Sequence, residues 1–219
     1  PSPSFIMNMY RTSAENSSVH SKAAIKRASN ICNSCINLIN NYMVRTALEK
    51  DIPLIAGGYV GGQIPKDTAV MEIDVASHTP MREAALKSYQ KTFGKESSRY
   101  FNIAPSLLSS AKSTNVTILN PMLTIAITES ELLEAITPLG WERPEDTGDM
   151  SSNCRLNDLG IAVHFKQHGF HPYVMELAEQ VRNGLLSREA GLKKASSIPE
   201  WADVQEQAEA IRLPHDAIQ

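Results

Sequence analysis

The feature that most constrains the fold is a helical pattern that leads into a short apolar segment and then into glycines. Apolar side chains recur every three or four positions over residues 33–50, which predicts an amphipathic helix. Residues 52–56 are too few for a helix and predict a buried strand, which ends at Gly57-Gly58. A helix, a buried strand and a glycine loop in this order are typical of a parallel α/β sheet.

Later segments continue this pattern. The sequence predicts a helix over 79–93, with Thr79 and Pro80 at its start, and a buried strand over 116–119. A capping box at 128–131 begins another helix, and helices are expected to follow from Pro172, from Ser187 and from a second capping box at 197–200. We therefore expect an α/β fold with a parallel sheet of few strands and a helical C-terminal region.

The expected organisation has three parts. Residues 1–30 look irregular, residues 31–125 form the α/β part, and residues 126–219 form the helical region. Within the last part, residues 142–158 show neither a helical nor a strand period, and a long irregular stretch in a compact domain is usually functional or disordered. We expect this loop to fold over a site.

Composition excludes several classes of protein. A chain that is 42% hydrophobic and 21% charged belongs with folded soluble domains rather than disordered ones. Its net charge of −3 argues against broad nucleic-acid binding, which depends on phosphate neutralisation by Lys and Arg. No apolar run approaches the ~20 residues of a membrane span. Three cysteines are too few for a disulfide scaffold, so a reducing cytoplasm is the expected compartment.

The cysteines are the first candidates for chemistry. Cys32 and Cys35 form a CxxC motif at the start of the first predicted helix, where backbone N–H groups favour thiolates. Cys154 lies in the irregular loop. The motif and the third thiol could be unrelated; structural zinc would need a fourth ligand such as His20 or His164, and three thiolates suit a [4Fe–4S] cluster with one open iron.

Glycines and histidines give two further candidates. A loop after the first buried strand allows close approach of backbone to a nucleotide, or is simply a tight surface turn; it contains Gly57, Gly58, Tyr59, Gly61, Gly62 and Gln63. His164, His168 and His171 lie close together in the sequence. A metal cluster is one interpretation of these histidines, and a solvated loop is the favoured one.

The block from Cys32 to Gly58 resembles the second half of the N-type ATP pyrophosphatase (PP-loop) superfamily, in which a CxxC helix precedes a strand and a glycine-containing loop. Residues 120–133 are similar to the superfamily segment that leads into a helix, Cys154 occupies the third-cysteine position of its thiolation enzymes, and residues 184–189 resemble the end of its sugar amidotransferases. The similarity covers roughly residues 30–195. The motif Ser-Gly-Gly-x-Asp-Ser is absent, and we expect it upstream of Pro1 in a longer protein.

The resemblance implies a Rossmann-like fold of the adenine nucleotide α-hydrolase type and an enzyme that uses ATP and Mg²⁺ to adenylate an acceptor carbonyl. A sulfur atom would then displace AMP, with Cys32, Cys35 and Cys154 holding a [4Fe–4S] cluster. The loop at 57–63 would contact nucleotide, and Arg155 would point towards phosphate or acceptor. Gly62 and Gln63 stand where thiolation enzymes carry an acidic pair, so no Mg²⁺ ligand is assigned there.

The implied partners are a small-molecule or sugar acceptor rather than tRNA, a protein that donates sulfur or ammonia, and no membrane; a homodimer is an option. Two other functions stay open. One is an ATP-dependent amidotransferase that acts on a nucleotide-linked or lipopolysaccharide sugar. The other is a non-catalytic α/β fragment that binds structural zinc.

Overall fold

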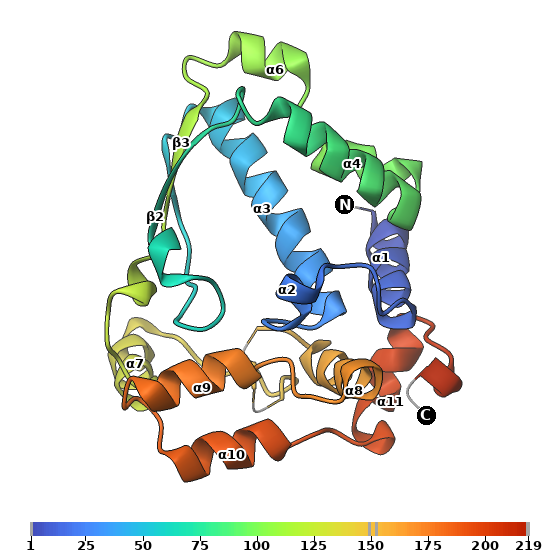
Figure 1. Cartoon of the computed structure of the whole chain (residues 1–219), viewed down its shortest axis with the longest axis vertical. Helices are drawn as coiled ribbons and strands as arrows, with labels where there is room; N and C mark the ends of the chain where they lie inside the picture. The colour runs from blue at the N-terminus through green and yellow to red at the C-terminus, as the bar shows by residue number, and fades with distance from the viewer. Residues whose placement is uncertain (1, 149, 152, 218–219) are drawn as a thin grey trace.

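The structure is a computed structural model that describes residues 2–148, 150–151 and 153–217 (Figure 1). Its strands are β1 (Leu54–Ala56), β2 (Val70–Asp74) and β3 (Asn115–Leu119). Its helices are α1 (Pro3–Glu15), α2 (Lys22–Ile25), α3 (Asn30–Lys50), α4 (Thr79–Phe93), α5 (Ser98–Phe101), α6 (Pro105–Ser110), α7 (Glu129–Ile136), α8 (Asn157–His168), α9 (Val174–Arg182), α10 (Arg188–Ser196) and α11 (Trp201–Ala210). The fold is therefore α/β, as expected, and mostly helical.

The sheet is small and mixed. Its strand order is β1-β3-β2, in which β1 runs parallel to β3 and β2 runs antiparallel to it. The expectation of a purely parallel sheet is therefore wrong for β2. Parallel neighbours need a long crossover, which β1 and β3 have, whereas no α-helix separates β1 from β2. Charged residues interrupt the apolar ones over residues 70–74, so this segment does not have the continuous apolar pattern of a buried strand. The sequence analysis therefore did not predict β2.

Several local predictions are confirmed. The helix over 79–93 has the expected bounds, although its N-cap is His78 and makes no side-chain capping bond. Thr128 and Glu131 form the predicted capping box of α7. Ser187 caps α10 by accepting from the N–H of Ala190. These signals are local, which explains why they could be recognised without tertiary information.

Four predictions about order and helix starts are wrong. Residues 1–30 are not irregular, because Ser2 caps α1, Pro3 occupies its first turn and one face of the helix is buried. Helix α8 begins at Asn157, inside the segment expected to be a loop. Pro172 lies before α9 rather than in its first turn, and the capping box expected at 197–200 is instead formed by Glu200 and Asp203.

Helix α3 is the central element of the fold and crosses the middle of the molecule in Figure 1. It supplies side chains to three separate hydrophobic clusters. Ile31 packs with α1, α8 and α11, and Leu38 packs with α1, α4 and α5. Ala47 and Leu48 pack with β1 and β3. Since α3 is fixed along its whole length, the side chains at its N-terminal end have a defined position.

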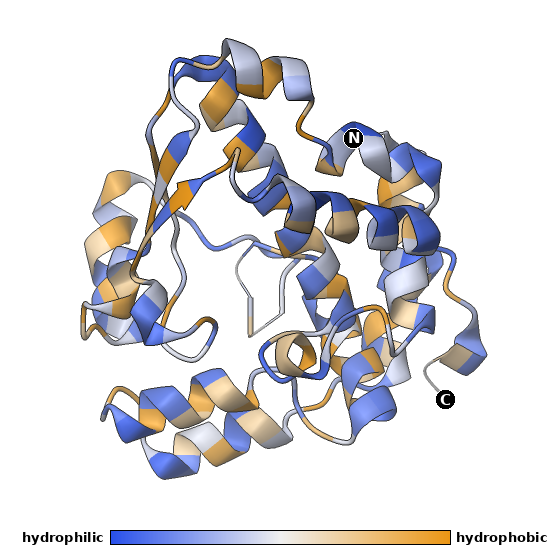
Figure 2. Ribbon diagram, turned by 45° about the horizontal axis from the view of Figure 1, so that its top comes forward, coloured by the Kyte–Doolittle hydropathy of each residue, from blue (hydrophilic) through white to orange (hydrophobic). Residues whose placement is uncertain are grey.

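Hydrophobic and hydrophilic residues are interspersed along the helices (Figure 2). Within the described ranges, no helix combines the length and the apolar character that a membrane crossing requires.

The capping box of α7 gives a first prediction. Replacing Thr128 with Ala removes the hydroxyl that accepts from the N–H of Glu131, and it should lower the free energy of unfolding by about 1 kcal/mol. Urea denaturation measures the change. Ser109→Ala, at an exposed serine near the end of α6, is the control and should stay within about 0.5 kcal/mol of wild type. Equal effects of the two substitutions would contradict a capping role.

Candidate functional site

The thiols at the start of α3 are positioned by its N-cap. The Ser29 hydroxyl accepts from the N–H of Cys32 over 3.2 Å, which places Cys32 in the first turn and Cys35 one turn later. Burial raises the pKa of Cys32, although its hydrogen bond with Ser29 partly offsets the shift. The sequence favoured a thiolate here, but desolvation outweighs the helix N-terminus and keeps the Cys32 thiol protonated.

Cys154 lies within electrostatic reach of the other two cysteines. Burial, followed by the proximity of Cys32, raises the pKa of Cys154 to about 11, and Cys35 adds to the shift. Cys32, Cys35 and Cys154 also each contribute to raising the pKa of the Tyr10 hydroxyl, after the larger effect of burial. The structure therefore brings together the residues of the CxxC motif and the distant third cysteine. We call Cys32, Cys35 and Cys154 the thiol centre.

Two tyrosines and an asparagine surround the thiol centre. The Tyr10 hydroxyl donates to the sulfur of Cys35 over 3.4 Å, and the Tyr173 oxygen lies 4.0 Å from the sulfur of Cys32. The Tyr173 hydroxyl also donates to Oδ1 of Asn157. Because that bond uses its single proton, the thiol of Cys32 is the donor to Tyr173. Burial is the main cause that raises the pKa of both tyrosines.

The sequence suggested that Cys32, Cys35 and Cys154 bind zinc or a [4Fe–4S] cluster. Three thiols are the right donors for a soft metal or an iron–sulfur cluster. However, across residues 2–148, 150–151 and 153–217 no group of three or more His, Cys, Asp or Glu side chains is arranged to hold a metal ion. The thiol centre as it stands does not fit a cluster or zinc.

His20, considered above as a zinc ligand, belongs to a hydrogen-bonded relay. Ser13 donates its hydroxyl proton to the carbonyl of Met9, so Ser34 must donate to Ser13 over 2.7 Å. His20 must then donate from Nε2 to Ser34 over 2.8 Å. The relay ties α1 to α3 beside the thiol centre, and its proton directions exclude Ser34 as a nucleophile activated by His20.

The histidines at 164, 168 and 171 are not a solvated loop, so that interpretation is wrong. His164 and His171 are only 1% and 2% exposed, because α8 turns this face towards the protein interior. The rings of His164 and His168 lie 4.6 Å apart between centroids. Burial lowers the pKa of His164 and of His171 to about 4, and for His164 the two neighbouring histidines contribute further.

The glycine loop divides into two halves. Gly57 and Tyr59 line a cavity, whereas Gly61 and Gly62 pack against α9. The side chain of Gln63 also contacts α9, because its Nε2 donates to Oε2 of Glu176 over 3.0 Å. Of the predicted nucleotide-binding residues, Gly57 and Tyr59 are therefore the ones that face the cavity. Gly58 is exposed, and a Cβ added there would meet nothing within 4 Å.

The cavity has a volume of about 530 Å³ and lies between α3 and the sheet. We call it the α3–sheet cavity. Such a volume is within the usual range of small-molecule sites. Ile36 lies one helical turn after Cys32 and lines the cavity, so the wall that α3 supplies to the cavity begins one turn from Cys32.

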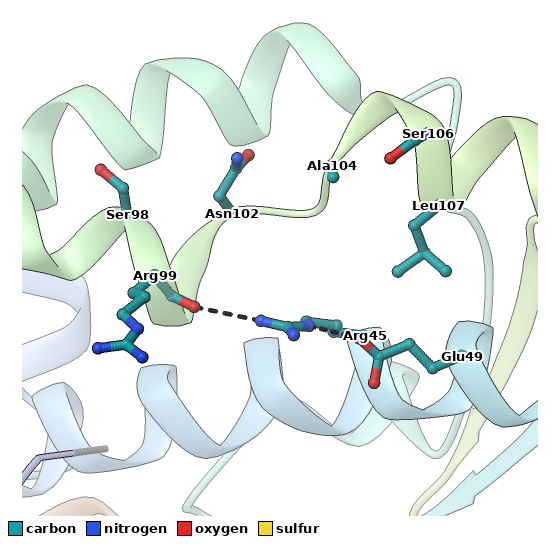
Figure 3. A pocket seen from close by; sticks show the side chains of 8 residues that line it. All are labelled: Arg45, Glu49, Ser98, Arg99, Asn102, Ala104, Ser106 and Leu107. Atoms are coloured by element: carbon teal, nitrogen blue, oxygen red, sulfur yellow. Dashed lines mark hydrogen bonds and ion pairs between the residues drawn. The ribbon is translucent and has the colours of Figure 1, made fainter.

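A second cavity, of about 400 Å³, lies near the other end of α3 (Figure 3). Its lining is polar, and Arg45 forms an ion pair with Glu49 at 2.8 Å and donates to the carbonyl of Arg99 over 3.1 Å. At a rise of about 1.5 Å per residue, Arg45 lies about 20 Å along α3 from Cys32. This cavity is therefore separate from the thiol centre.

No contact between described residues joins Arg155 to the thiol centre. Its guanidinium forms an ion pair with Asp146 at 3.0 Å, and its side chain is 67% exposed. The predicted loop thus brings Cys154 to the CxxC motif and leaves Arg155 on the surface. Residues 149 and 152 of this loop lie outside the described residues.

Sequence reasoning missed Tyr10 and Tyr173, which contact the thiol centre, and Arg82 and Asn120, which line the α3–sheet cavity. The helix that carries Tyr10 could have been predicted, because Ser2 and Pro3 are a typical helix start and Phe5 and Met9 then lie on one apolar face. The other three are assembled by tertiary contacts and had no local signal.

Comparison of the chain with models of known families, with curated proteins and with solved structures found no match.

Proposed function

We propose that this chain takes part in an ATP-dependent sulfur transfer, with the thiol centre handling the sulfur. The observation that carries the proposal is the gathering of all three cysteines of the chain from two distant segments. Ile36, one helical turn after Cys32 on α3, lines a cavity of small-molecule size. Sulfur transfer of the kind proposed uses more than one thiol.

The activating step follows from the resemblance. A carbonyl oxygen of the acceptor attacks the α-phosphate of ATP, and pyrophosphate leaves. The exposed Gly58 follows β1, which runs parallel to β3, so it stands outside the α3–sheet cavity at the carboxyl end of a parallel strand, where open sheets bind ligands. This edge is the proposed point of nucleotide contact, and Mg²⁺ would arrive with the ATP phosphates.

The transfer step can be written with the thiols alone. A donor protein leaves a persulfide on one cysteine, and its terminal sulfur attacks the adenylated carbon and displaces AMP. A second cysteine of the thiol centre, as thiolate, then attacks Sγ of the first cysteine and breaks the bond between that Sγ and the transferred sulfur. The thiocarbonyl product departs, and the resulting disulfide is reduced by a cellular thiol. Burial keeps the resting thiols protonated, which protects them from oxidation.

Sulfur loading tests the proposal. The full chain is incubated with glutathione persulfide that carries labelled sulfane sulfur, and protein-bound label is measured after gel filtration and by mass spectrometry. We expect label on the wild type and at least a ten-fold loss in the variant with Cys32, Cys35 and Cys154 all replaced by Ser. Equal background labelling of both proteins would overturn the proposal.

Iron, sulfide and zinc are measured on the same anaerobically purified protein. Stoichiometric iron and sulfide with a brown colour would replace the persulfide route by a cluster. Stoichiometric zinc without sulfur loading would favour the non-catalytic alternative. Ser187→Ala, at the N-cap of the remote helix α10, serves as the matched control and should load sulfur like the wild type.

A further inference from the structure

We propose that the α3–sheet cavity takes an apolar molecule that carries one anionic group and one N–H donor, and that this molecule is the acceptor. The second clause rests on the proposed function; binding of such a ligand does not. Three features of the cavity support such a ligand: its apolar lining, a cation beside it and one buried oxygen without a partner.

The lining is mainly aliphatic and sulfur-containing. It is supplied by one face of α3, by the facing sides of all three strands and by the start of α4. The apolar side chains include Ile36, Met43, Val44, Ile55, Met71, Ile73, Met81 and Ile118. Methionine side chains adapt to the shape of a bound group, and burying apolar ligand surface against an apolar wall is favourable.

Arg82 provides the charge. It lines the cavity from α4 and is fixed there by donating to the carbonyl of Val75 and, over 3.2 Å, to the hydroxyl of Thr79. Asp74 and Glu83 are near enough to affect its pKa, but burial is the larger cause and lowers it. None of the ion pairs between described residues includes Arg82. A held guanidinium without an ion-pair partner favours an anionic group in the adjoining space.

Asn120 provides the polar recognition. It is completely buried, and its Nδ2 donates to the carbonyl of Thr68 over 2.9 Å, which fixes Oδ1 as a pure acceptor. Oδ1 has no hydrogen-bond partner within the described part of the chain, and Asn120 lines the cavity. A buried acceptor without a partner is costly unless a ligand or water supplies a donor. We assign that donor to an N–H group of the ligand.

The same lining argues against a sugar or a triphosphate as the occupant of this cavity. A sugar ring carries many hydroxyls, and each would lose water against Ile and Met side chains without gaining a partner. Three phosphates would need several cations, and Arg82 is the one Lys or Arg among the residues that line the cavity. The cavity therefore fits an acceptor outside the sugar class that the resemblance includes.

Titration calorimetry with small probes tests the assignment on the full chain. Indole-3-acetate has an apolar ring, an N–H donor and a carboxylate, and we expect saturable binding. Tryptamine, which replaces the anion by a cation, and 1-methylindole-3-acetate, which lacks the N–H, should each bind at least ten-fold more weakly. Glucose 1-phosphate should show no saturable binding. Similar binding of all four probes would overturn the proposal.

Variants locate the site. Arg82→Gln should weaken indole-3-acetate at least ten-fold, whereas Arg99→Gln, at the second cavity, should not change its affinity. Gly57→Ala places a Cβ 2.2 Å from Oδ1 of Asn120 and should also weaken binding. Circular dichroism checks that each variant is folded. Unchanged affinity in both Arg82→Gln and Gly57→Ala would refute the site.

The triple cysteine-to-serine variant separates this proposal from the proposed function. If the cavity is the acceptor site, that variant should bind indole-3-acetate like the wild type. Loss of sulfur loading with intact probe binding would concern the thiol centre alone. Intact sulfur loading without probe binding would refute the cavity assignment alone.

Discussion

Gly62→Ala should destabilise the protein by about 2–5 kcal/mol, the sum of backbone strain and overpacking. Gly62 has φ +92°, a conformation that residues with a Cβ rarely adopt. A Cβ there would lie 2.3 Å from Cα of Glu176 and 2.8 Å from the carbonyl oxygen of Met175. These are backbone atoms of α9 and its first turn, so no side-chain movement can relieve the clash. The loop would have to leave α9.

Urea denaturation and proteolysis measure this effect. Detachment should break the bond from Gln63 to Glu176 and the 2.8 Å bond from Arg27 to the carbonyl of Gly62, and it should speed cleavage within residues 57–69. Gly58→Ala is the matched control, because a Cβ at Gly58 meets nothing within 4 Å. It should change stability by less than about 0.5 kcal/mol. Similar losses in both variants would show that this packing is unimportant.

Acidification should lower stability between pH 6.5 and pH 4. His20, His164 and His171 each have a pKa lowered by burial to about 4, against 6.5 for an unburied histidine. Above pH 6.5 these side chains are neutral in both the folded and the unfolded chain and contribute nothing to pH dependence. Below pH 6.5 these histidines bind protons in the unfolded chain but stay neutral in the folded chain. The free energy of unfolding therefore falls as the pH is lowered to about 4. The loss is on the order of 3 kcal/mol for each histidine at most.

Urea midpoints measured at several pH values from 7.5 to about 4.5 test this sign and size. His164→Gln removes one titrating group and should flatten the profile, whatever it does to stability at neutral pH. Val163→Ala is its control, because it disturbs the neighbouring buried position, which is 2% exposed, without removing a titrating group. Its profile should run parallel to that of the wild type. A wild-type profile that stays flat down to pH 5 would contradict the burial of the histidines.

The sequence by itself determined the elements whose signals are local. The apolar period of α3, the bounds of α4, the capping box of α7 and the N-cap of α10 could each be read within one stretch of chain. The CxxC motif at the start of α3 was visible for the same reason.

Tertiary structure alone decided the direction of β2, the burial of the three clustered histidines and the composition of the site. Strand direction depends on where the chain returns, and residues 70–74 carry no signal for that. Cys154 reaches Cys32 and Cys35 because the loop before α8 returns to the N-terminus of α3, which no spacing in the sequence shows. The cavity is likewise shared by α3, the strands and α4, so its chemistry exists only once they are packed together.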